Sequence, residues 1–372
     1  MWTYRNPVSV HFGLEQFNLL PDLIGNRSYA LVTYPDPPFA ELTDRLAAVA
    51  GAPVVVVDDV APNPDYVLLA QQCQRLAGTA RPVEVIVALG GGSVIDSAKV
   101  FAAANGDFSV VKRFLETKQG AEDLSAIPII AVPTTAGTGS EVTCWATVWK
   151  EETGQKYSLA RDALYPEAAV IDPALMLAKP YGLTLATGLD ALSHALESIW
   201  NVNANPVSAR HAVFAAQTIL AKLPDLLHDL DNVELRSQQA EASLAAGLAF
   251  SNTKTAIAHN LSYPITLGWG VQHGIACSFS LPTILRSVRD LDGFRGAALE
   301  QVFGPDLMRG ADMLDQVLLD MGVGLRFSDH GVGQDDSLKI IDDAFTGERG
   351  RNFIGQKQDF LNVARDNGVI SA

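Results

Sequence analysis

Asp190 and His194 lie four residues apart in the segment GLDALSHALE of residues 188–197. On a helix this spacing places both side chains on one face. Two further histidines, His259 and His273, follow in apolar or glycine-flanked surroundings. One carboxylate and three imidazoles are enough to complete a divalent metal site. Because this set contains no thiolate, it suits Fe²⁺ or Zn²⁺, and ligand softness does not separate the two metals.

Each of these histidines also has a simpler explanation. A single histidine on an apolar helix is more often a hydrogen-bonded core residue than a ligand, and Asp190 with His194 also fits a pair on a helix surface. The chain has only seven histidines, however, and three of them fall in this pattern beside a carboxylate. The coincidence favours a metal centre.

Two loops in the first half of the chain have the composition of a nucleotide site. GGGSVIDSAK (residues 90–99) follows a β-branched run, and PTTAGTGSE (residues 133–141) follows another. Glycines let the backbone approach a ligand closely, and a helix N-terminus offers N–H groups and partial positive charge to a pyrophosphate. Two such loops at strand ends of one parallel sheet predict a nucleotide crevice at its carboxyl edge. A glycine-rich turn and a capped helix start, both without ligand, are the simpler alternatives.

The elements that must position these groups fall into two halves. In the first half, strand-like and helix-like segments alternate, which predicts a parallel sheet with helices on both faces. After about residue 180 the pattern is helical and rich in alanine. We therefore predict an α/β dinucleotide-binding domain at residues 1–180 and an all-helical metal and substrate domain at residues 181–372. Strands are expected at 29–33, 53–57, 83–89 and 127–132, and helices at 39–50, 66–76, 93–104, 191–199, 209–223, 237–250 and 307–320.

The composition excludes several classes of partner. The 372 residues carry 27 basic and 42 acidic side chains, a net charge of −15, which disfavours nucleic acid and anionic membranes. No apolar run reaches the roughly 18 residues of a membrane span, and no signal peptide is evident. Three cysteines without CxxC spacing fit a reducing compartment. The expectation is a cytoplasmic protein.

Four blocks of the sequence resemble the iron-containing (group III, metal-dependent) alcohol dehydrogenase family. They are GGGSVIDSAK, PTTAGTGSEVT, GLDALSHALES and the stretch from His259 through His273 to Leu281-Pro282, and they occur in the family's order. The resemblance implies an N-terminal α/β dinucleotide-binding domain, an all-α C-terminal domain, bound Fe²⁺ (or Zn²⁺) and NAD or NADP. It also implies a homodimer formed through an edge strand near residues 8–12. The metal ligands, which act in catalysis through the metal, correspond to Asp190, His194, His259 and His273.

The resemblance assigns further residues to the cofactor and the substrate. Where many relatives have another histidine, this chain has Tyr263, a phenol that donates a hydrogen bond but is a poor base, so a histidine proton relay is in doubt. Relatives that prefer NAD often carry an Asp directly after the first strand, where it repels the 2′-phosphate of NADP. Here Tyr34 follows that strand and Asp36 stands two residues later, so the preference between NAD and NADP stays open. The positions assigned to the cofactor are Gly91, Gly92, Ser93, Asp96, Thr134, Thr135, Thr138, Ser140 and Lys156.

The implied reaction is hydride transfer between NAD(P)H and a small aldehyde. Polar residues near the ligands, Lys254 together with Asn201, Asn203 and Asn205, would suit an anionic tail on that aldehyde. These segments resemble the phosphonoacetaldehyde reductases, which form 2-hydroxyethylphosphonate. The alternatives are a reductase of another small or sulfonated aldehyde, in which Lys254 is a surface lysine and the asparagines form an ordinary loop, and a glycerol-dehydrogenase-like or dehydroquinate-synthase-like enzyme.

Two interpretations from other classes remain. A nucleotide-binding protein without catalytic activity would need a disabled metal site, but all four ligand positions are intact. A metal hydrolase would leave both glycine-rich loops unexplained.

Overall fold

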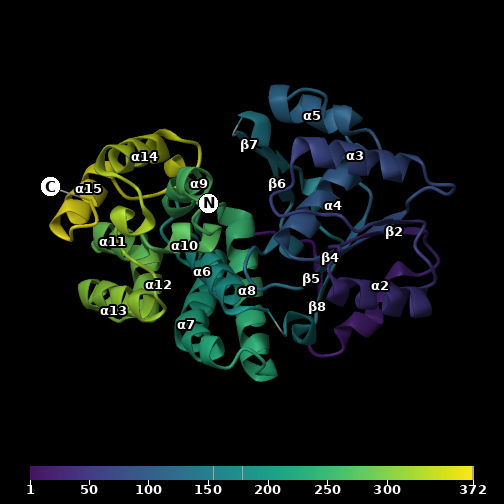
Figure 1. The fold of residues 1–372 in the computed structure, drawn as a ribbon. Helices are drawn as coiled ribbons and strands as arrows, with labels where there is room; N and C mark the ends of the chain where they lie inside the picture. The colour runs from purple at the N-terminus through teal and green to yellow at the C-terminus, as the bar shows by residue number, and fades with distance from the viewer. Residues whose placement is uncertain (154, 178, 371–372) are drawn as a thin grey trace. The chain divides into compact units, whose positions relative to one another are not determined.

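The computed structural model describes residues 1–153, 155–177 and 179–370 (Figure 1). Contacts along the chain divide these residues into two compact units. The sheet unit comprises residues 7–135 and 139–177, and the helical unit comprises residues 1–6, 136–138 and those from 179 onward. Residues 1–6 and 136–138, which the sequence places in the first domain, therefore group with the helices.

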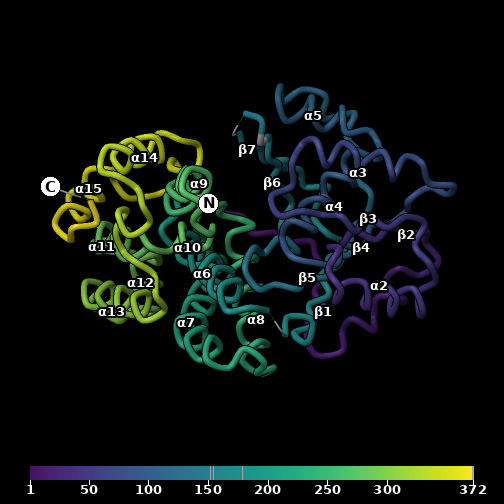
Figure 2. Tube along the Cα trace, viewed as in Figure 1, coloured from purple at the N-terminus to yellow at the C-terminus, as the bar shows by residue number. Residues whose placement is uncertain are grey.

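A six-stranded parallel sheet forms the centre of the sheet unit, in the order β1-β8-β5-β4-β2-β3. The Cα trace in Figure 2 shows β2, β4 and β5 beside one another. The parallel sheet expected from the sequence is confirmed, but β8 and a separate antiparallel hairpin, β6–β7, were not predicted. The strands are β1 (Ser9–Phe12), β2 (Tyr29–Val32), β3 (Val55–Val57), β4 (Val85–Gly90), β5 (Ile129–Pro133), β6 (Trp145–Lys150), β7 (Gln155–Ala160) and β8 (Ala168–Ile171).

Helices cover both faces of the sheet because successive strand side chains point in opposite directions. Val32, Ile86 and Ala88 pack into a core with α3 (Tyr66–Ala77), α4 (Gly92–Ala104) and α5 (Phe108–Thr117). Their neighbours Leu31 and Val87 pack into a second core with α1 (Leu20–Ile24) and α2 (Pro37–Ala50). The strands are buried on both sides, which explains their continuous apolar sequences.

The helical unit is built around α6 (Tyr181–Glu197), which packs against α7, α8 and α10. The all-helical second half is thus confirmed. The helix expected at 307–320 is present with those bounds as α13, whereas α6 starts ten residues before the expected position. No helix among the described residues is long and apolar enough to cross a bilayer. The other helices are α7 (Pro206–His228), α8 (Val233–Thr253), α9 (Ile257–Trp269), α10 (His273–Ser278), α11 (Leu281–Ser287), α12 (Gly293–Phe303), α13 (Leu307–Asp320), α14 (Gln334–Thr346) and α15 (Lys357–Asp366).

A glycine allows α10 to lie directly against α6. A Cβ atom on Gly274 would stand 1.7 Å from the carbonyl oxygen of Ala186, so any side chain there would force the two helices apart. His273, the first residue of α10, is thereby brought to the middle of α6, where Asp190 lies. Close helix packing is therefore what joins these two distant parts of the sequence.

Candidate metal and nucleotide sites

Asp190 is the centre of a buried polar cluster in the helical unit. Its Oδ1 atom lies 3.3 Å from Nε2 of His259, 3.8 Å from Nε2 of His273 and 3.9 Å from Nε2 of His194. Burial by itself raises the pKa of the Asp190 carboxyl, but the three imidazoles together hold it well below its usual range. The four residues that the sequence singles out are thus brought together around one carboxylate oxygen.

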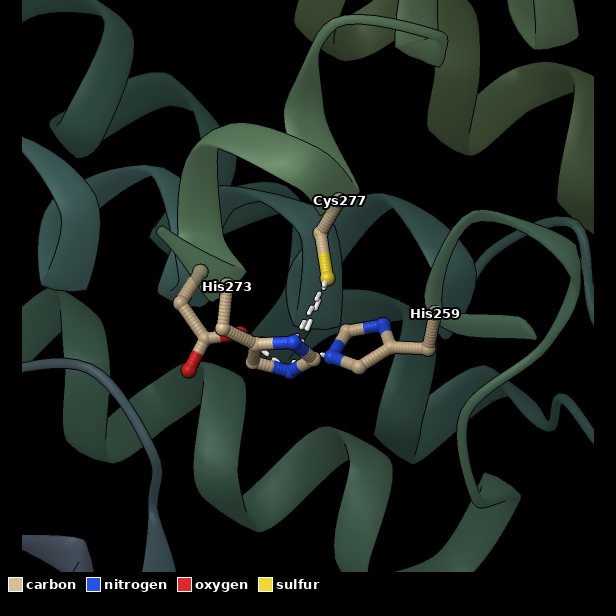
Figure 3. A group of neighbouring side chains, drawn as sticks. His259, His273 and Cys277 are labelled. Atoms are coloured by element: carbon tan, nitrogen blue, oxygen red, sulfur yellow. Dashed lines mark hydrogen bonds and ion pairs between the residues drawn. The ribbon is translucent and has the colours of Figure 1, made fainter. Parts of the chain in front are cut away.

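Cys277 also lies in this cluster, and the sequence analysis did not include it. Its Sγ is 3.6 Å from Nε2 of His273, one helical turn before it on α10. The ligand atoms of Asp190, His259, His273 and Cys277 all lie within 4.8 Å of one another. Figure 3 shows the two imidazoles and the thiol directed toward the same point. The signal in the sequence was the i, i+4 spacing from His273 to Cys277.

The donor set fits a divalent cation. Oδ1 of Asp190 and Nε2 of His259 are fully buried and have no hydrogen-bond partner of good geometry among the described residues. Buried polar atoms without partners are costly, and a cation between them would satisfy both. Burial lowers the pKa of His194 to about 4, which keeps this imidazole neutral, the form that binds metals. His273 is the most open of the group, with 38% of its side chain exposed.

Glu197 orients His259 through Nδ1, the ring nitrogen that is not directed toward Asp190. Its Oε2 lies 2.7 Å from Nδ1 of His259, while its two oxygens accept backbone N–H groups of Ala256, Ala258 and His259 at the start of α9. Burial tends to raise the pKa of Glu197, but these contacts hold it below its usual value. A carboxylate on Nδ1 keeps the proton there and leaves the Nε2 lone pair for a metal. The sequence placed Glu197 three residues after His194 but assigned it no role.

Tyr263 packs on the exposed ligand. Its ring lies nearly parallel to that of His273, at 10° and with centroids 5.6 Å apart. The guanidinium carbon of Arg349 lies 4.8 Å from the centre of the Tyr263 ring. Burial raises the pKa of the Tyr263 phenol, although the Arg349 cation opposes this, so the phenol is a hydrogen-bond donor rather than a base.

The expected substrate residues form a loop junction. Nδ2 of Asn201 donates to the carbonyl of Lys254 at 3.1 Å, and its Oδ1 accepts the backbone N–H of Asn203. The Asn203 amide donates to the carbonyl of Thr253. Asn205 caps α7, accepting the first N–H groups of that helix. The amides of Asn201 and Asn205 are buried and occupied by these bonds, whereas the side chain of Lys254 is exposed.

In the sheet unit, the two glycine-rich loops leave adjacent parallel strands at the same edge. Gly91 is the N-cap of α4, and Gly92 and Ser93 begin the helix. A Cβ atom on Gly91 would lie 3.1 Å from Oγ1 of Thr135, so the two loops approach each other closely at this glycine. The buried Thr134 donates its N–H to the carbonyl of Gly90. This edge adjoins the point between β2 and β4 where the strand order reverses, the usual place for a nucleotide.

A buried lysine fixes the second loop to α4. Nζ of Lys99 donates to the carbonyl and hydroxyl of Ser140 at 2.7 and 2.9 Å, and also to Thr143 and Trp145. Ser140 in turn donates to Asp96 at 2.5 Å. Asp96 and Ser140 therefore hold the loop in place, which is a positioning task. Sequence reasoning missed Lys99, although it lies within the first glycine-rich block.

The other two expected cofactor residues lie beside this framework. Lys156 lies on β7, and its Nζ is 5.2 Å from the centre of the Trp149 ring. Thr138 belongs to the short segment, residues 136–138, that groups with the helical unit. The second loop thus supplies residues to both units.

Two family models cover nearly the whole chain. The model described as "Iron-containing alcohol dehydrogenase" matches residues 7–173. The model described as "Fe-containing alcohol dehydrogenase family, C-terminal" matches residues 184–361.

Individual relatives agree with these matches. The chain is 37% identical over 252 residues to the phosphonoacetaldehyde reductase of Streptomyces viridochromogenes, covering 66% of this chain and 62% of that one. It is 30% identical over 275 residues to the NAD-dependent methanol dehydrogenase of Bacillus methanolicus, covering 70% and 71%. The crystal structure of sulfoacetaldehyde reductase from Bifidobacterium kashiwanohense in complex with NAD⁺ superposes with a TM-score of 0.91 at 28% identity, over 100% of this chain and 99% of that one. The blocks that carry the cluster and the loops lie within these matches, and the chain belongs to the iron-containing alcohol dehydrogenase family.

Proposed function

We propose that this protein reduces a small anionic aldehyde with a nicotinamide cofactor, using a divalent metal held by Asp190, His194, His259 and His273. The observation that carries the proposal is the convergence of three imidazole nitrogens, at 3.3–3.9 Å, on one buried carboxylate oxygen. A bound cation at such a site acts as a Lewis acid on a carbonyl oxygen and stabilises the negative charge that develops there.

The reaction is aldehyde + NAD(P)H + H⁺ → alcohol + NAD(P)⁺, with the hydride passing to the carbonyl carbon. The chain's own residues orient the reactants and hold protons. Glu197 keeps the proton of His259 on Nδ1. Tyr263 packs on the partly exposed His273, and we infer that its phenol donates a hydrogen bond to the substrate oxygen.

The cofactor assignment rests on the loops after β4 and β5. We infer that the first turn of α4, with Gly91, Gly92 and Ser93, receives the pyrophosphate through backbone N–H groups. Thr134, Thr135, Thr138 and Lys156 are proposed to line the rest of the nucleotide. The NAD-dependent methanol dehydrogenase and the NAD⁺ complex among the relatives support NAD over NADP.

The substrate class rests on two of the relatives. A phosphonoacetaldehyde reductase and a sulfoacetaldehyde reductase act on two-carbon aldehydes that end in a tetrahedral oxyanion. We propose the same class of substrate for this chain.

The test is NADH and NADPH oxidation by protein reconstituted with Fe²⁺ or Zn²⁺. The panel comprises phosphonoacetaldehyde, sulfoacetaldehyde, propionaldehyde and glyceraldehyde, with and without a chelator. The expected result is chelator-sensitive turnover with the highest kcat/KM for an anionic aldehyde. Absence of turnover on every aldehyde with either metal would rule the proposal out, and a preference for propionaldehyde would reject the anionic class alone.

The identity of the fourth ligand gives a separate prediction, because His194 and Cys277 both lie near the other three residues. His194→Ala is expected to lose most of the bound metal, while Cys277→Ala keeps it, since imidazole and carboxylate already complete a four-ligand site. Metal content after dialysis measures this. An intense thiolate-to-cobalt absorption band in Co²⁺-substituted protein, lost in Cys277→Ala, would contradict the assignment.

Removal of the buried lysine tests the loop framework. Lys99→Ala leaves the carbonyl groups of Ser140 and Trp145 without their donor, so the free energy of unfolding is expected to fall by about 3 kcal/mol. KM for NADH should rise about tenfold as the second loop loosens. Thermal unfolding and cofactor kinetics measure the two effects, with the exposed Lys112→Ala on α5 as control. An unchanged KM for NADH would separate this loop from cofactor binding.

We further propose a homodimer formed through β1. This strand pairs only with β8 among the described strands, so one of its edges is open to a second copy. A single-chain mass in light scattering would contradict the dimer.

Three cysteines without disulfide partners, all of them buried, support a reducing compartment such as the cytoplasm.

A further inference from the structure

Arg349 is a cation that contacts a neighbour of the metal cluster, Tyr263. It stands between α14 and the short helix η8 (Gly350–Asn352), and its guanidinium carbon is 4.8 Å from the centre of the Tyr263 ring. Tyr263 is stacked in turn on His273. Arg349 is therefore two ring contacts away from a ligand of the proposed metal, on the ligand that is most open to solvent.

The charge of Arg349 has no anionic partner in the part of the chain that the structure describes. Among the described residues its half-buried guanidinium makes only the contact with the Tyr263 ring, with no hydrogen bond and no ion pair. Two other arginines of the helical unit differ in this respect, because Arg286 bonds two aspartates and Arg295 bonds backbone carbonyls. A guanidinium offers a fork of N–H donors that matches a tetrahedral oxyanion, and such charge-assisted pairs are among the stronger hydrogen bonds.

The turn that carries Arg349 is fixed in place. Nδ2 of Asn352 donates to the carbonyl of Thr255 at 2.8 Å, and the carbonyl of Asn352 accepts the N–H of Val202 at 2.8 Å. A Cβ atom on Gly350 would stand 2.0 Å from the carbonyl oxygen of Ala344, so the turn is also closely packed. Because Thr255 leads directly into α9, the backbone of this turn is fixed relative to the helix that carries His259 and Tyr263. The turn therefore does not have to become ordered when a ligand binds, and only the side chain of Arg349 has freedom to lose.

The asparagines that the sequence assigned to the substrate have a supporting role in the structure. Asn201 and Asn203 tie the loop before α7 to the carbonyls of Lys254 and Thr253, and so support the turn that carries Arg349. Lys254 contributes its backbone to this junction, and its side chain is exposed. Water competes fully for the charge of an exposed lysine, which is therefore worth little to a bound anion.

We propose that Arg349 selects the anionic aldehyde, its guanidinium receiving the phosphonate or sulfonate group while the carbonyl end faces the metal cluster. This inference rests on the proposed function and names the residue that recognises its substrate class. The alternative is a purely structural cation–π contact between Arg349 and Tyr263. Such a contact would affect charged and neutral aldehydes equally.

The experiment compares phosphonoacetaldehyde, sulfoacetaldehyde and propionaldehyde on metal-loaded protein. Arg349→Ala is expected to raise KM for the anionic aldehydes about 30-fold or more, as loss of a charged hydrogen bond does. KM for propionaldehyde should change far less, and Arg349→Lys should restore part of the loss as a point charge. In wild-type protein, the ratio of KM for phosphonoacetaldehyde to KM for sulfoacetaldehyde shows which oxyanion the site prefers. Arg351→Ala, an exposed arginine two residues on, is the matched control, with changes below about threefold.

Binding without turnover gives an independent measurement. Methylphosphonate and inorganic sulfate should protect wild-type protein against thermal unfolding, and Arg349→Ala should lose this protection. Equal changes in KM for charged and neutral aldehydes would overturn the proposal. If KM rises selectively for the anionic aldehydes in Lys254→Ala but not in Arg349→Ala, the anion is bound by Lys254 and not by Arg349. If wild-type protein reduces no aldehyde, the proposed function fails, whereas the protection experiment still decides the role of Arg349.

Discussion

Asp190→Asn is expected to abolish stable metal binding and to lower kcat/KM for any aldehyde by about a thousandfold or more. Oδ1 of Asp190 is the atom on which the imidazoles of His259, His273 and His194 converge. The substitution removes the only negative charge in the predicted set of four ligands, so nothing balances a dication among three neutral imidazoles. An amide also brings N–H donors toward nitrogens that must present lone pairs.

Metal content after dialysis and steady-state kinetics measure the effect of Asp190→Asn. Asp225→Asn is the matched control, because Asp225 is exposed on α7 and the change of charge is the same. Apo-protein melting temperatures within a few degrees of wild type would show that the fold survives. Retention of both metal and activity in Asp190→Asn would remove Asp190 from the site and with it the proposed chemistry.

Glu197→Gln is expected to weaken metal binding about 10–100-fold without removing any direct ligand. The two oxygens of Glu197 accept backbone N–H groups at the start of α9 and contact Nδ1 of His259 at 2.7 Å. Glutamine has one oxygen only. If its NH₂ group faces His259, the imidazole must accept at Nδ1 and carry its proton on Nε2, where the metal should bind. If its oxygen faces His259, the NH₂ group meets backbone N–H donors.

Either orientation of the amide in Glu197→Gln also leaves a buried group unsatisfied, so the free energy of unfolding should fall by about 2–3 kcal/mol. Chelator competition gives the metal affinity, and thermal unfolding of apo and loaded protein separates stability from binding. Glu241→Gln on the exposed face of α8 is the control. Wild-type metal affinity in Glu197→Gln, even with reduced stability, would show that Glu197 only caps α9.

Local sequence patterns were enough to predict the class of fold. Continuous β-branched runs at residues 83–89 and 127–132 predicted strands buried on both sides, and the structure has β4 and β5 there in a parallel pair. Strong local patterns of this kind survive in any tertiary context, as does the α13 helix with its capping Asp306. The β6–β7 hairpin was missed, because neither strand is a continuous buried run: β6 mixes buried with partly buried residues, and β7 is largely polar with exposed ends.

Ligand chemistry was also readable from residue types, since an i, i+4 pair such as Asp190 and His194 shares a helix face in any fold. Contacts between remote segments, by contrast, came only from tertiary packing. Glu197 reaches His259 across 62 residues, and Lys99 reaches Ser140 across 41. Arg349 reaches Tyr263 only because α9 and α14 pack together. Such contacts depend on how helices and loops pack, and local sequence patterns do not reveal that packing. They orient the predicted metal ligands and bring a cation close to them.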